Sequence, residues 1–417
     1  MDSSEISGFR QTNPFFNIPR PRSREHFKIA IICALARELD AISVLLDERY
    51  QGSDYGKVEG DWNVYRPGRI GHHYVVLFTM GMGIRNAATA AAHLRTSYTH
   101  IDLALLVGIC GGVPFLAGRE GGTETILGDV VISDSIIQYN YGRQYPNGFE
   151  RKSDIRDQLS LPNRPIKTFL ADLESHGALD ELWSEMRCHL EVLSLAHPTK
   201  WRYLGASEDK LFHASYRHKH HFQPSRNLLC ICAMCHSSKD PVCDDAIDGD
   251  CDTTGCSGSL IVRERLLGGA TPLPLIRVGT IASADTVMKS GEHRDKLVEQ
   301  ENVIAFEMEG AGAWETLPCV IIKGVCDYAD SHKSKKWQDY AAATAASCAK
   351  AFLKKWIPTD RSSRKFVSII KNPKVANQHK TSNCVLLNIS RRWRFYARVG
   401  PKKQRNSYPI LFVLHSH

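Results

Sequence analysis

The sequence predicts a mixed α/β fold in which a central, mostly parallel sheet is flanked by helices. Short apolar runs of strand type recur along the chain, and segments with apolar residues at helical spacing lie between several of them. Alternation of this kind is typical of a parallel sheet covered by helices on both faces. The composition agrees, because 43% hydrophobic and 24% charged residues in a chain of 417 is ordinary for a globular protein.

The predicted strands are compact apolar runs bounded by glycine or polar residues. They cover residues 27–33, 62–65, 73–78, 103–107, 128–134, 275–281, 303–306 and 319–325, and the second and third are expected to pair as a hairpin. Helical spacing predicts helices over 38–47, 86–94, 179–195, 310–315 and 337–356. The glycine-rich residues 108–112 are expected to form a loop after the fourth strand.

Composition along the chain predicts one large domain with appendages. Residues 27–356 form the predicted domain, which contains a polar insertion rich in cysteine and histidine over 150–270. Residues 1–26 and 357–417 are predicted tails, and the second is expected to be poorly ordered. That tail holds 13 Lys/Arg and one acid, a net charge of +12, whereas the remaining residues sum to −4. Charge therefore does not favour nucleic-acid binding by the domain, and the basic tail is either a solvated extension or a contact for an anionic surface.

The cysteine content and the hydropathy pattern point to a cytoplasmic protein without a membrane span. The longest apolar run, residues 103–117, is interrupted by glycine and proline and is shorter than the ~18–20 residues that a membrane helix needs. The first 26 residues do not resemble a secretory signal. Thirteen cysteines, an odd number, then favour reduced thiols in the cytosol.

The insertion contains a dense group of potential metal ligands. Cys230-x-Cys232-x-x-Cys235-His236 has the density of a zinc-binding segment, and a structural zinc ion could hold together a segment too polar to form its own core. The spacing does not match a closed pair of C-x-x-C motifs, so the sequence assigns no ligands. A cysteine-rich surface loop without metal is the alternative.

Four chemically distinctive features fall at the ends of predicted strands, where open α/β sheets place their binding sites. They are Glu38, the glycines of 108–112, the pair Glu307 and Glu309, and Asp327. Each has an ordinary explanation, such as a favourable helix-dipole contact, a tight turn or a helix cap. Three carboxylates and a glycine-rich segment at one sheet edge nevertheless indicate a functional site. Alternation along the strand predicts that Glu307 and Glu309 point to opposite sides.

The order of these segments resembles the nucleoside phosphorylase and nucleosidase superfamily. The chain is most similar to fungal domains of that superfamily that precede other modules in NLR-like proteins. With them it shares the sequences GRQYP (142–146), YRHKHH (216–221) and KGVCDYADSH (323–332). The segments that match the superfamily occur in family order over 27–356 and are IICALARE (31–38), GMG (81–83), VGICGG (107–112), LGDVV (127–131), IASAD (281–285), FEME (306–309) and VCDYAD (325–330).

The resemblance implies a three-layer sandwich that cleaves the N-ribosidic bond of a purine nucleoside or nucleotide. Glu309 matches the carboxylate that holds the ribose hydroxyls, and Met308 the residue that packs on the ribose face. Asp327 matches the acid that serves the purine N7, a role that needs a raised pKa. Val287 matches the wall of the base site, after Ser283. Gly108, Ile109 and Gly111 match the glycine segment that lines the site.

The identity of the nucleophile stays open between water and phosphate. In the hydrolytic branch of the family a glutamate after the first strand activates water, and Glu38 matches it. Phosphorolysis needs phosphate ligands; Arg37 matches one of them, whereas Leu106 and Ile109 replace two others. Arg85 could supply a replacement cation, and Arg143 could reach a phosphate group on the substrate.

The resemblance also bears on cofactors and partners. No cofactor is expected, apart from inorganic phosphate as co-substrate of a phosphorylase, and a homo-oligomer is expected. The alternative function is a non-catalytic module that senses a nucleoside or nucleotide within an NLR-like signalling protein. Glu307 is expected to support the site through a backbone amide or a nearby cation.

Overall fold

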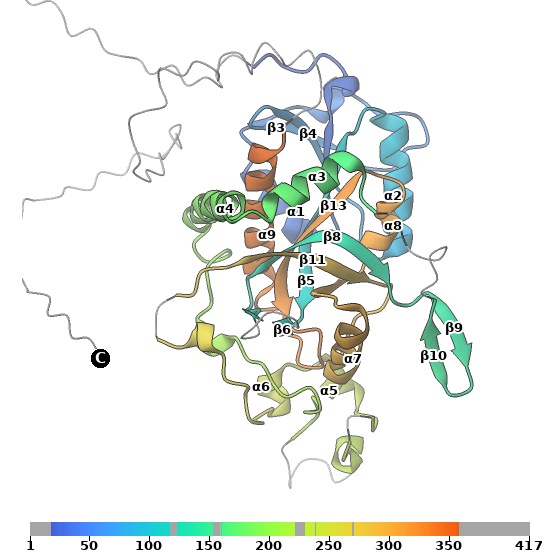
Figure 1. Cartoon of the computed structure of the whole chain (residues 1–417), viewed down its shortest axis with the longest axis vertical. Coiled ribbons are helices and arrows are strands. Elements are labelled where there is room, and N and C mark those ends of the chain that lie inside the picture. The colour runs from blue at the N-terminus through green and yellow to red at the C-terminus, as the bar shows by residue number, and fades with distance from the viewer. Residues whose placement is uncertain are drawn as a thin grey trace, which may run out of the picture. The chain divides into compact units, whose positions relative to one another are not determined.

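A nine-stranded mixed sheet forms the centre of the molecule (Figure 1). The structure is a computed structural model that describes residues 18–116, 123–152, 159, 161–221, 230–237, 239–268 and 271–357. Most of both predicted tails, residues 1–17 and 358–417, lies outside the described residues. The strands of the sheet are β1 (Ile29–Cys33), β2 (Glu48–Arg49), β3 (Arg66–Ile70), β4 (His73–Thr79), β5 (Leu103–Gly112), β8 (Val130–Gln138), β11 (Ile276–Ser283), β12 (Ala305–Glu307) and β13 (Cys319–Asp327).

The sheet order brings the carboxyl ends of several strands together. The order is β12-β11-β8-β13-β5-β1-β4-β3-β2, and β12 also pairs with the end of β5, so that five of the strands close into a ring. The pairs β1–β4, β1–β5, β5–β13, β8–β11 and β11–β12 are parallel. The pairs β8–β13, β5–β12, β2–β3 and β3–β4 are antiparallel. The predicted mixed sheet is thereby confirmed, with parallel pairs in a narrow majority.

Helices cover the two faces of the sheet as the alternation predicts. One face carries α1 (Ala36–Val44), α3 (Arg164–Leu173), α4 (His176–Ala196) and α9 (Gln338–Lys355), and the other carries α2 (Ile84–Ser97) and α8 (Gly310–Trp314). Helix α7 (Gly291–Glu301) follows β11 and packs over a smaller third cluster. The remaining elements are short: β6 (Phe115–Leu116), β7 (Thr123–Glu124), the hairpin of β9 (Gly142–Tyr145) and β10 (Gly148–Arg151), α5 (Asp244–Asp248) and α6 (Cys251–Thr254).

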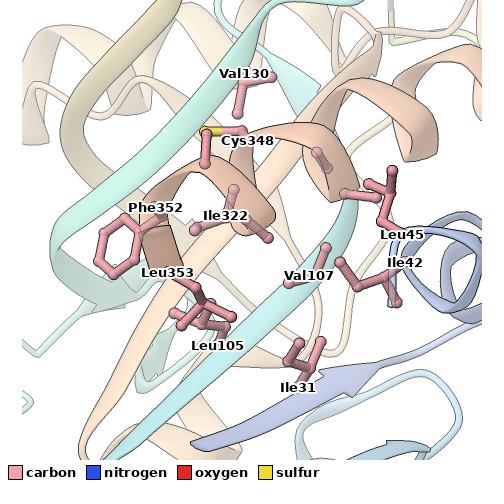
Figure 2. Close-up of a cluster of buried hydrophobic side chains, with 14 of the residues drawn as sticks. Ile31, Ile42, Leu45, Leu105, Val107, Val130, Ile322, Cys348, Phe352 and Leu353 are labelled. Carbon is pink, nitrogen blue, oxygen red and sulfur yellow. The ribbon is translucent and has the colours of Figure 1, made fainter. Parts of the chain in front are cut away.

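Alternation along the strands divides the hydrophobic core into two layers. Ile31 of β1 and Leu105 of β5 face α1 and α9, where Phe352 and Leu353 pack on the sheet (Figure 2). Their neighbours Ile32 and Leu106 lie in the opposite cluster, beneath α2 and α8. Both faces of the central strands are therefore buried, which explains why they read as continuous apolar runs.

Three local predictions are corrected by the structure. Residues 62–65 are not a strand; the hairpin consists of β3 and β4, where Pro67 and Gly68 pair with Val76 and Val75. Residues 108–112 are not a loop but the end of β5, because β12 and β13 supply hydrogen-bonding partners there. The opening helices of the 150–270 segment, α3 and α4, contribute to the main core rather than to a polar surface.

Two findings concern the predictions on membranes and thiols. No helix among the described residues has the length and apolarity needed to cross a membrane. Eleven of the described cysteines are free thiols.

Candidate active site

Glu38 is held at the start of α1 by backbone donors from two strand ends. The side chain is buried, and its Oε2 accepts hydrogen bonds from the amides of Ala34 and Leu35, each at 2.8 Å. Its Oε1 accepts one from the amide of Ile109 at 2.9 Å. Burial raises the pKa of Glu38, although Lys323 and these amides act in the opposite direction. The carboxylate is therefore fixed in position and has a greater affinity for a proton than an exposed glutamate.

Two glycines of β5 allow carboxylates to approach the strand closely. A Cβ atom at Gly108 would lie 2.3 Å from Oε1 of Glu38, and one at Gly111 would lie 2.8 Å from Oδ1 of Asp327. Real Cβ atoms do not come so close to other atoms, so neither position accepts a side chain without displacing its carboxylate. The end of β5 thus brings Glu38 and Asp327 to one edge of the sheet.

The buried ammonium of Lys323, on β13, lies among three buried carboxylates. Its Nζ is 3.0 Å from Oε2 of Glu309 and 3.9 Å from Oε2 of Glu307. Burial opposes the charge on Lys323, but the charges of Glu309, Glu38 and Glu307 outweigh it and raise the pKa of the ammonium. Lys323 therefore stays charged and partly balances the carboxylate cluster.

Glu307 supports the turn that carries Glu309. Its carboxylate accepts hydrogen bonds from the amides of Glu309 and Gly310, at 2.9–3.0 Å, where β12 ends and α8 begins. Burial raises the pKa of Glu307, and Lys323 lowers it. The prediction that Glu307 and Glu309 point to opposite sides is wrong, because both reach Lys323; the strand ends at Glu307, so alternation no longer applies.

Asp327 lies in the last position of β13 and is paired with a lysine. Its Oδ1 accepts a hydrogen bond from the amide of Ala329 at 2.9 Å and lies 2.5 Å from Nζ of Lys333. Burial disfavours the charge on Lys333, but Asp327 outweighs burial and raises the pKa of this ammonium. Ala329 has a φ of 52°, which is uncommon for a residue other than glycine. The chain thus turns sharply just after Asp327.

The other residues predicted to contact a substrate differ in their surroundings. Ser283, at the end of β11, is buried, and its Oγ accepts a hydrogen bond from the amide of Ala311 at 3.0 Å. Met308 and Ile109 are half-buried beside the carboxylate cluster, and Ile109 contributes its amide to Glu38. Val287 is exposed in the loop between β11 and α7.

The three arginines considered as phosphate ligands are not brought together. Arg37 forms an ion pair of 3.1 Å with Asp339 of α9. Arg85 is exposed on the first turn of α2, and among the described residues its guanidinium forms no ion pair. Arg143 is exposed on β9, in the hairpin that extends away from the sheet (Figure 1).

A pocket lies between Asp327 and the cysteine-rich segment, which comprises residues 230–256 and contributes Asp250, Cys251 and Asp252 to its lining. The residues that line it include Asp327, His332, Lys336, Trp337, Lys210 and Asp252. The pocket does not include Glu38 or Glu309. The buried glutamates therefore lie outside this cavity.

Lys323 and Lys333 are the two charged residues that sequence reasoning missed. The sequence does indicate that Lys323 is unusual, because it is a lysine within the otherwise apolar run Cys319–Val325. A buried lysine needs a carboxylate partner, and the candidates were already known. Lys333 had no comparable signal, since it lies in a polar stretch that is ordinary for a loop.

Two solved structures that align with this chain are both of nucleoside-cleaving proteins by their names. The 5′-methylthioadenosine/S-adenosylhomocysteine nucleosidase from Streptococcus pneumoniae, with a transition-state inhibitor, aligns with 79% of this chain and 99% of its own at 19% identity, with a TM-score of 0.44. Futalosine hydrolase of Helicobacter pylori aligns with 79% of this chain and 98% of its own at 14% identity, with a TM-score of 0.45.

Two comparisons of sequence bear on the family. A nucleotide-binding leucine-rich repeat (NLR)-like protein from Hyaloscypha variabilis is 29% identical over 337 residues. This alignment covers 79% of the chain but only 29% of that relative, so the chain spans less than a third of the relative's length. The family model of the Phosphorylase superfamily matches residues 28–182, which contain Glu38 and Gly108. Over residues 28–182, less than half of its length, the chain is therefore similar to the Phosphorylase superfamily, in agreement with the resemblance of its motifs.

Proposed function

We propose that this chain cleaves the N-ribosidic bond of a purine nucleoside or nucleotide and that water is the nucleophile. The observation that supports the proposal most directly is the buried cluster of Glu38, Glu309 and Lys323 at the strand ends, with Asp327 against the same end of β5. Cleavage of this bond creates positive charge on the ribose and negative charge on the departing base. The cluster offers negative charge for the first, and Asp327 offers a proton or a hydrogen bond for the second.

Each carboxylate has a distinct part in the proposed reaction. Lys323 binds Oε2 of Glu309 and orients that carboxylate, whose Oε1 is assigned to the ribose hydroxyls. Glu38 accepts a proton from the attacking water, a role favoured by its raised pKa. Met308 packs against the ribose, and Asp327 interacts with N7 of the purine. Ser283 and Glu307 hold the start of α8 and so position Glu309.

The surroundings of the residues considered as phosphate ligands favour hydrolysis over phosphorolysis. A phosphate dianion needs charged or hydrogen-bonding partners. Arg37 is engaged with Asp339, and Leu106 is buried in the core. Arg85 and Arg143 form no ion pair with a described residue, but they are exposed on separate elements, α2 and β9, and a single exposed guanidinium is a weak phosphate site.

A panel of purine nucleosides and nucleotides, with and without inorganic phosphate, tests this proposal. We expect base release at the same rate in both conditions, because Glu38 activates water. Release that requires phosphate and yields ribose 1-phosphate would assign the chain to phosphorolysis instead. No base release from any member of the panel would contradict enzymatic cleavage.

Replacing Glu309 by glutamine is expected to lower kcat/KM by about 10²-fold, mainly through KM. A bond to a charged group contributes roughly 1.5–3 kcal/mol, and the neutral amide grips the ribose hydroxyls less strongly. Steady-state kinetics on the best substrate of the panel measure the change. A 2′,3′-dideoxy analogue is the control: it lacks the hydroxyls that Glu309 binds, so the replacement should lower its kcat/KM much less than that of the normal substrate. An unchanged kcat/KM on the normal substrate would contradict this role for Glu309.

The contact between Lys333 and Asp327 favours a second candidate function. Lys333 occupies Oδ1 of Asp327 at 2.5 Å, the carboxylate that the proposed reaction assigns to the base. A module that binds a purine nucleoside or nucleotide without cleaving it would tolerate this pair, and the NLR-like relative is consistent with such a module. Calorimetric binding of a nucleoside that the protein does not cleave would support it.

Predictions about the assembly accompany the proposed function. A homo-oligomer, a cytoplasmic location and the division into a domain with two tails stay predictions. So does the expectation that catalysis needs no cofactor. Sedimentation of the purified protein would measure its oligomeric state.

A further inference from the structure

Thiol and imidazole groups converge at two places among the described residues, both outside the carboxylate cluster. The first group is His220, Cys230, Cys232 and Cys243, and the second is His218, Cys251 and Cys256. Within each group the potential ligand atoms all lie within 4.8 Å of one another. All five cysteines are free thiols. Polar surface loops have no reason to bring so many thiols together.

The first group has the dimensions of a tetrahedral zinc site. Sγ of Cys243 lies 3.7 Å from Sγ of Cys230 and 3.6 Å from Sγ of Cys232. Nδ1 of His220 lies 3.6 Å from Sγ of Cys230 and 3.3 Å from Sγ of Cys243. A zinc ion with bonds of roughly 2.3 Å to sulfur and 2.0 Å to nitrogen requires ligand atoms about 3.5–3.8 Å apart. A disulfide needs its sulfurs about 2.0 Å apart, so the observed spacing suits a metal and not a disulfide.

The second group presents a histidine in the form that binds metal. Nδ1 of His218 lies 3.2 Å from Sγ of Cys256 and 3.8 Å from Sγ of Cys251. Nε2 of the same ring is 3.1 Å from the carbonyl oxygen of Gly249. A carbonyl oxygen only accepts, so Nε2 carries the proton and the lone pair on Nδ1 faces the two thiols. Histidines that bind zinc through one ring nitrogen usually donate a hydrogen bond from the other.

His332 is the natural fourth ligand of the second group. Its side chain is buried, and Nε2 has no hydrogen-bonding partner among the described residues, which is costly for a buried polar atom. The ring centroid of His332 lies 5.4 Å from that of His218, which places the imidazole next to the second group. A metal ion bound there would satisfy Nε2.

We propose that the chain binds two structural zinc ions, one by His220, Cys230, Cys232 and Cys243 and one by His218, Cys251, Cys256 and His332. Mixed thiolate and imidazole sets of four select zinc among the common divalent ions. His218 and His220 are separated by one residue and serve different ions, so the two sites share one stretch of backbone. The described part of this segment has only short helices and little core of its own, which a metal can replace.

The second ion would also connect the cysteine-rich segment to the active-site edge of the sheet. His332 follows Asp327 by five residues and lines the pocket beside it. An ion on His332 would fix the loop that carries Lys333 and so restrict the position of Asp327. The zinc sites do not depend on the proposed reaction, because metal content is measured without assaying turnover.

Metal analysis of the full chain, purified without chelators or metal-affinity resin, is the primary test. We expect two equivalents of zinc per chain. Cys243→Ser is expected to lose one equivalent, Cys256→Ser to lose the other, and His332→Ala to lose or weaken only the second. Cys235→Ser is the matched control: Cys235 lies between the first-site ligands in sequence, but its thiol contacts the carbonyl oxygens of Ser237 and Asp240, so two equivalents should remain.

A second measurement applies if a ligand variant does not fold. Wild-type protein is stripped of metal with a chelator and titrated with Co²⁺. We expect the d–d bands of tetrahedral Co²⁺ and a thiolate-to-cobalt charge-transfer band, both of which saturate at two equivalents. Less than a tenth of an equivalent of zinc in the purified protein, together with no such absorption, would overturn the proposal. Saturation at one equivalent, lost in Cys243→Ser, would overturn the second site and the connection through His332.

Discussion

Replacing Asp327 by asparagine is expected to lower kcat for base release about 10²–10⁴-fold, which is the usual contribution of a general acid. Asparagine preserves the shape of the side chain and still accepts the hydrogen bond from the amide of Ala329. It cannot deliver a proton to N7 of the purine. Lys333 loses its partner, but its side chain is 23% exposed, so water can solvate the ammonium and the fold should survive. Single-turnover kinetics on the best substrate of the panel measure the loss.

The matched control for Asp327→Asn is Asp40→Asn. Asp40 lies on α1, outside the carboxylate cluster, and forms an exposed ion pair of 3.0 Å with Lys200. Its replacement removes the same charge and should leave kcat within about twofold, because exposed ion pairs contribute little. Wild-type kcat in Asp327→Asn would exclude Asp327 as the acid. Equal losses in both variants would point to net charge rather than to proton transfer.

Replacing Lys323 by methionine is expected to lower the free energy of unfolding by about 3–5 kcal/mol at pH 7, the usual cost of leaving a buried charge without its partner. Methionine fills a similar volume, so the loss comes mainly from electrostatics. Glu309, Glu307 and Glu38 would keep their buried carboxylates without the ammonium that balances them. Urea unfolding at pH 7 and pH 5 measures the effect.

The pH dependence gives the Lys323→Met variant a distinctive signature. Burial already raises the pKa of Glu38 and of Glu307, and Lys323 lowers both, so its removal raises them further. A carboxyl group whose pKa is raised on folding contributes stability at low pH and loses it as pH rises through the folded-state value. The variant should therefore recover stability between pH 7 and pH 5, and its deficit relative to the wild type should shrink.

The matched control for Lys323→Met is Lys354→Met. Lys354 pairs with Glu185 at 2.5 Å, but both side chains are about two-fifths exposed, so the pair contributes at most about 1 kcal/mol. Its removal should cost little and should not change the dependence on pH. A Lys323→Met variant as stable as the wild type at pH 7, or a deficit that grows at pH 5, would contradict the electrostatic role of Lys323.

Much of the fold could be predicted from local pattern. The apolar runs of β1, β4, β5, β8, β11 and β13 are visible because both faces of these strands are buried. The end of β5 was not visible: Gly108, Gly111 and Gly112 look like a loop by local propensity. They form a strand because β12 and β13 pair with them. Gly108 and Gly111 lack side chains where the carboxylates of Glu38 and Asp327 approach the strand, and Gly112 lacks one where Val325 packs.

The sequence by itself determined the α/β class, the family resemblance and the carboxylates Glu38, Glu309 and Asp327 as candidates, since residue order and residue type carry that information. Only the tertiary structure decided their surroundings. Lys323 lies among the buried glutamates, and Lys333 forms an ion pair with Asp327. Arg37 forms an ion pair with Asp339. The tertiary structure also places the histidines and cysteines in two groups, neither of which includes Cys235 or His236. Contacts between residues distant in sequence depend on how the sheet and its loops pack, and no local pattern records that arrangement.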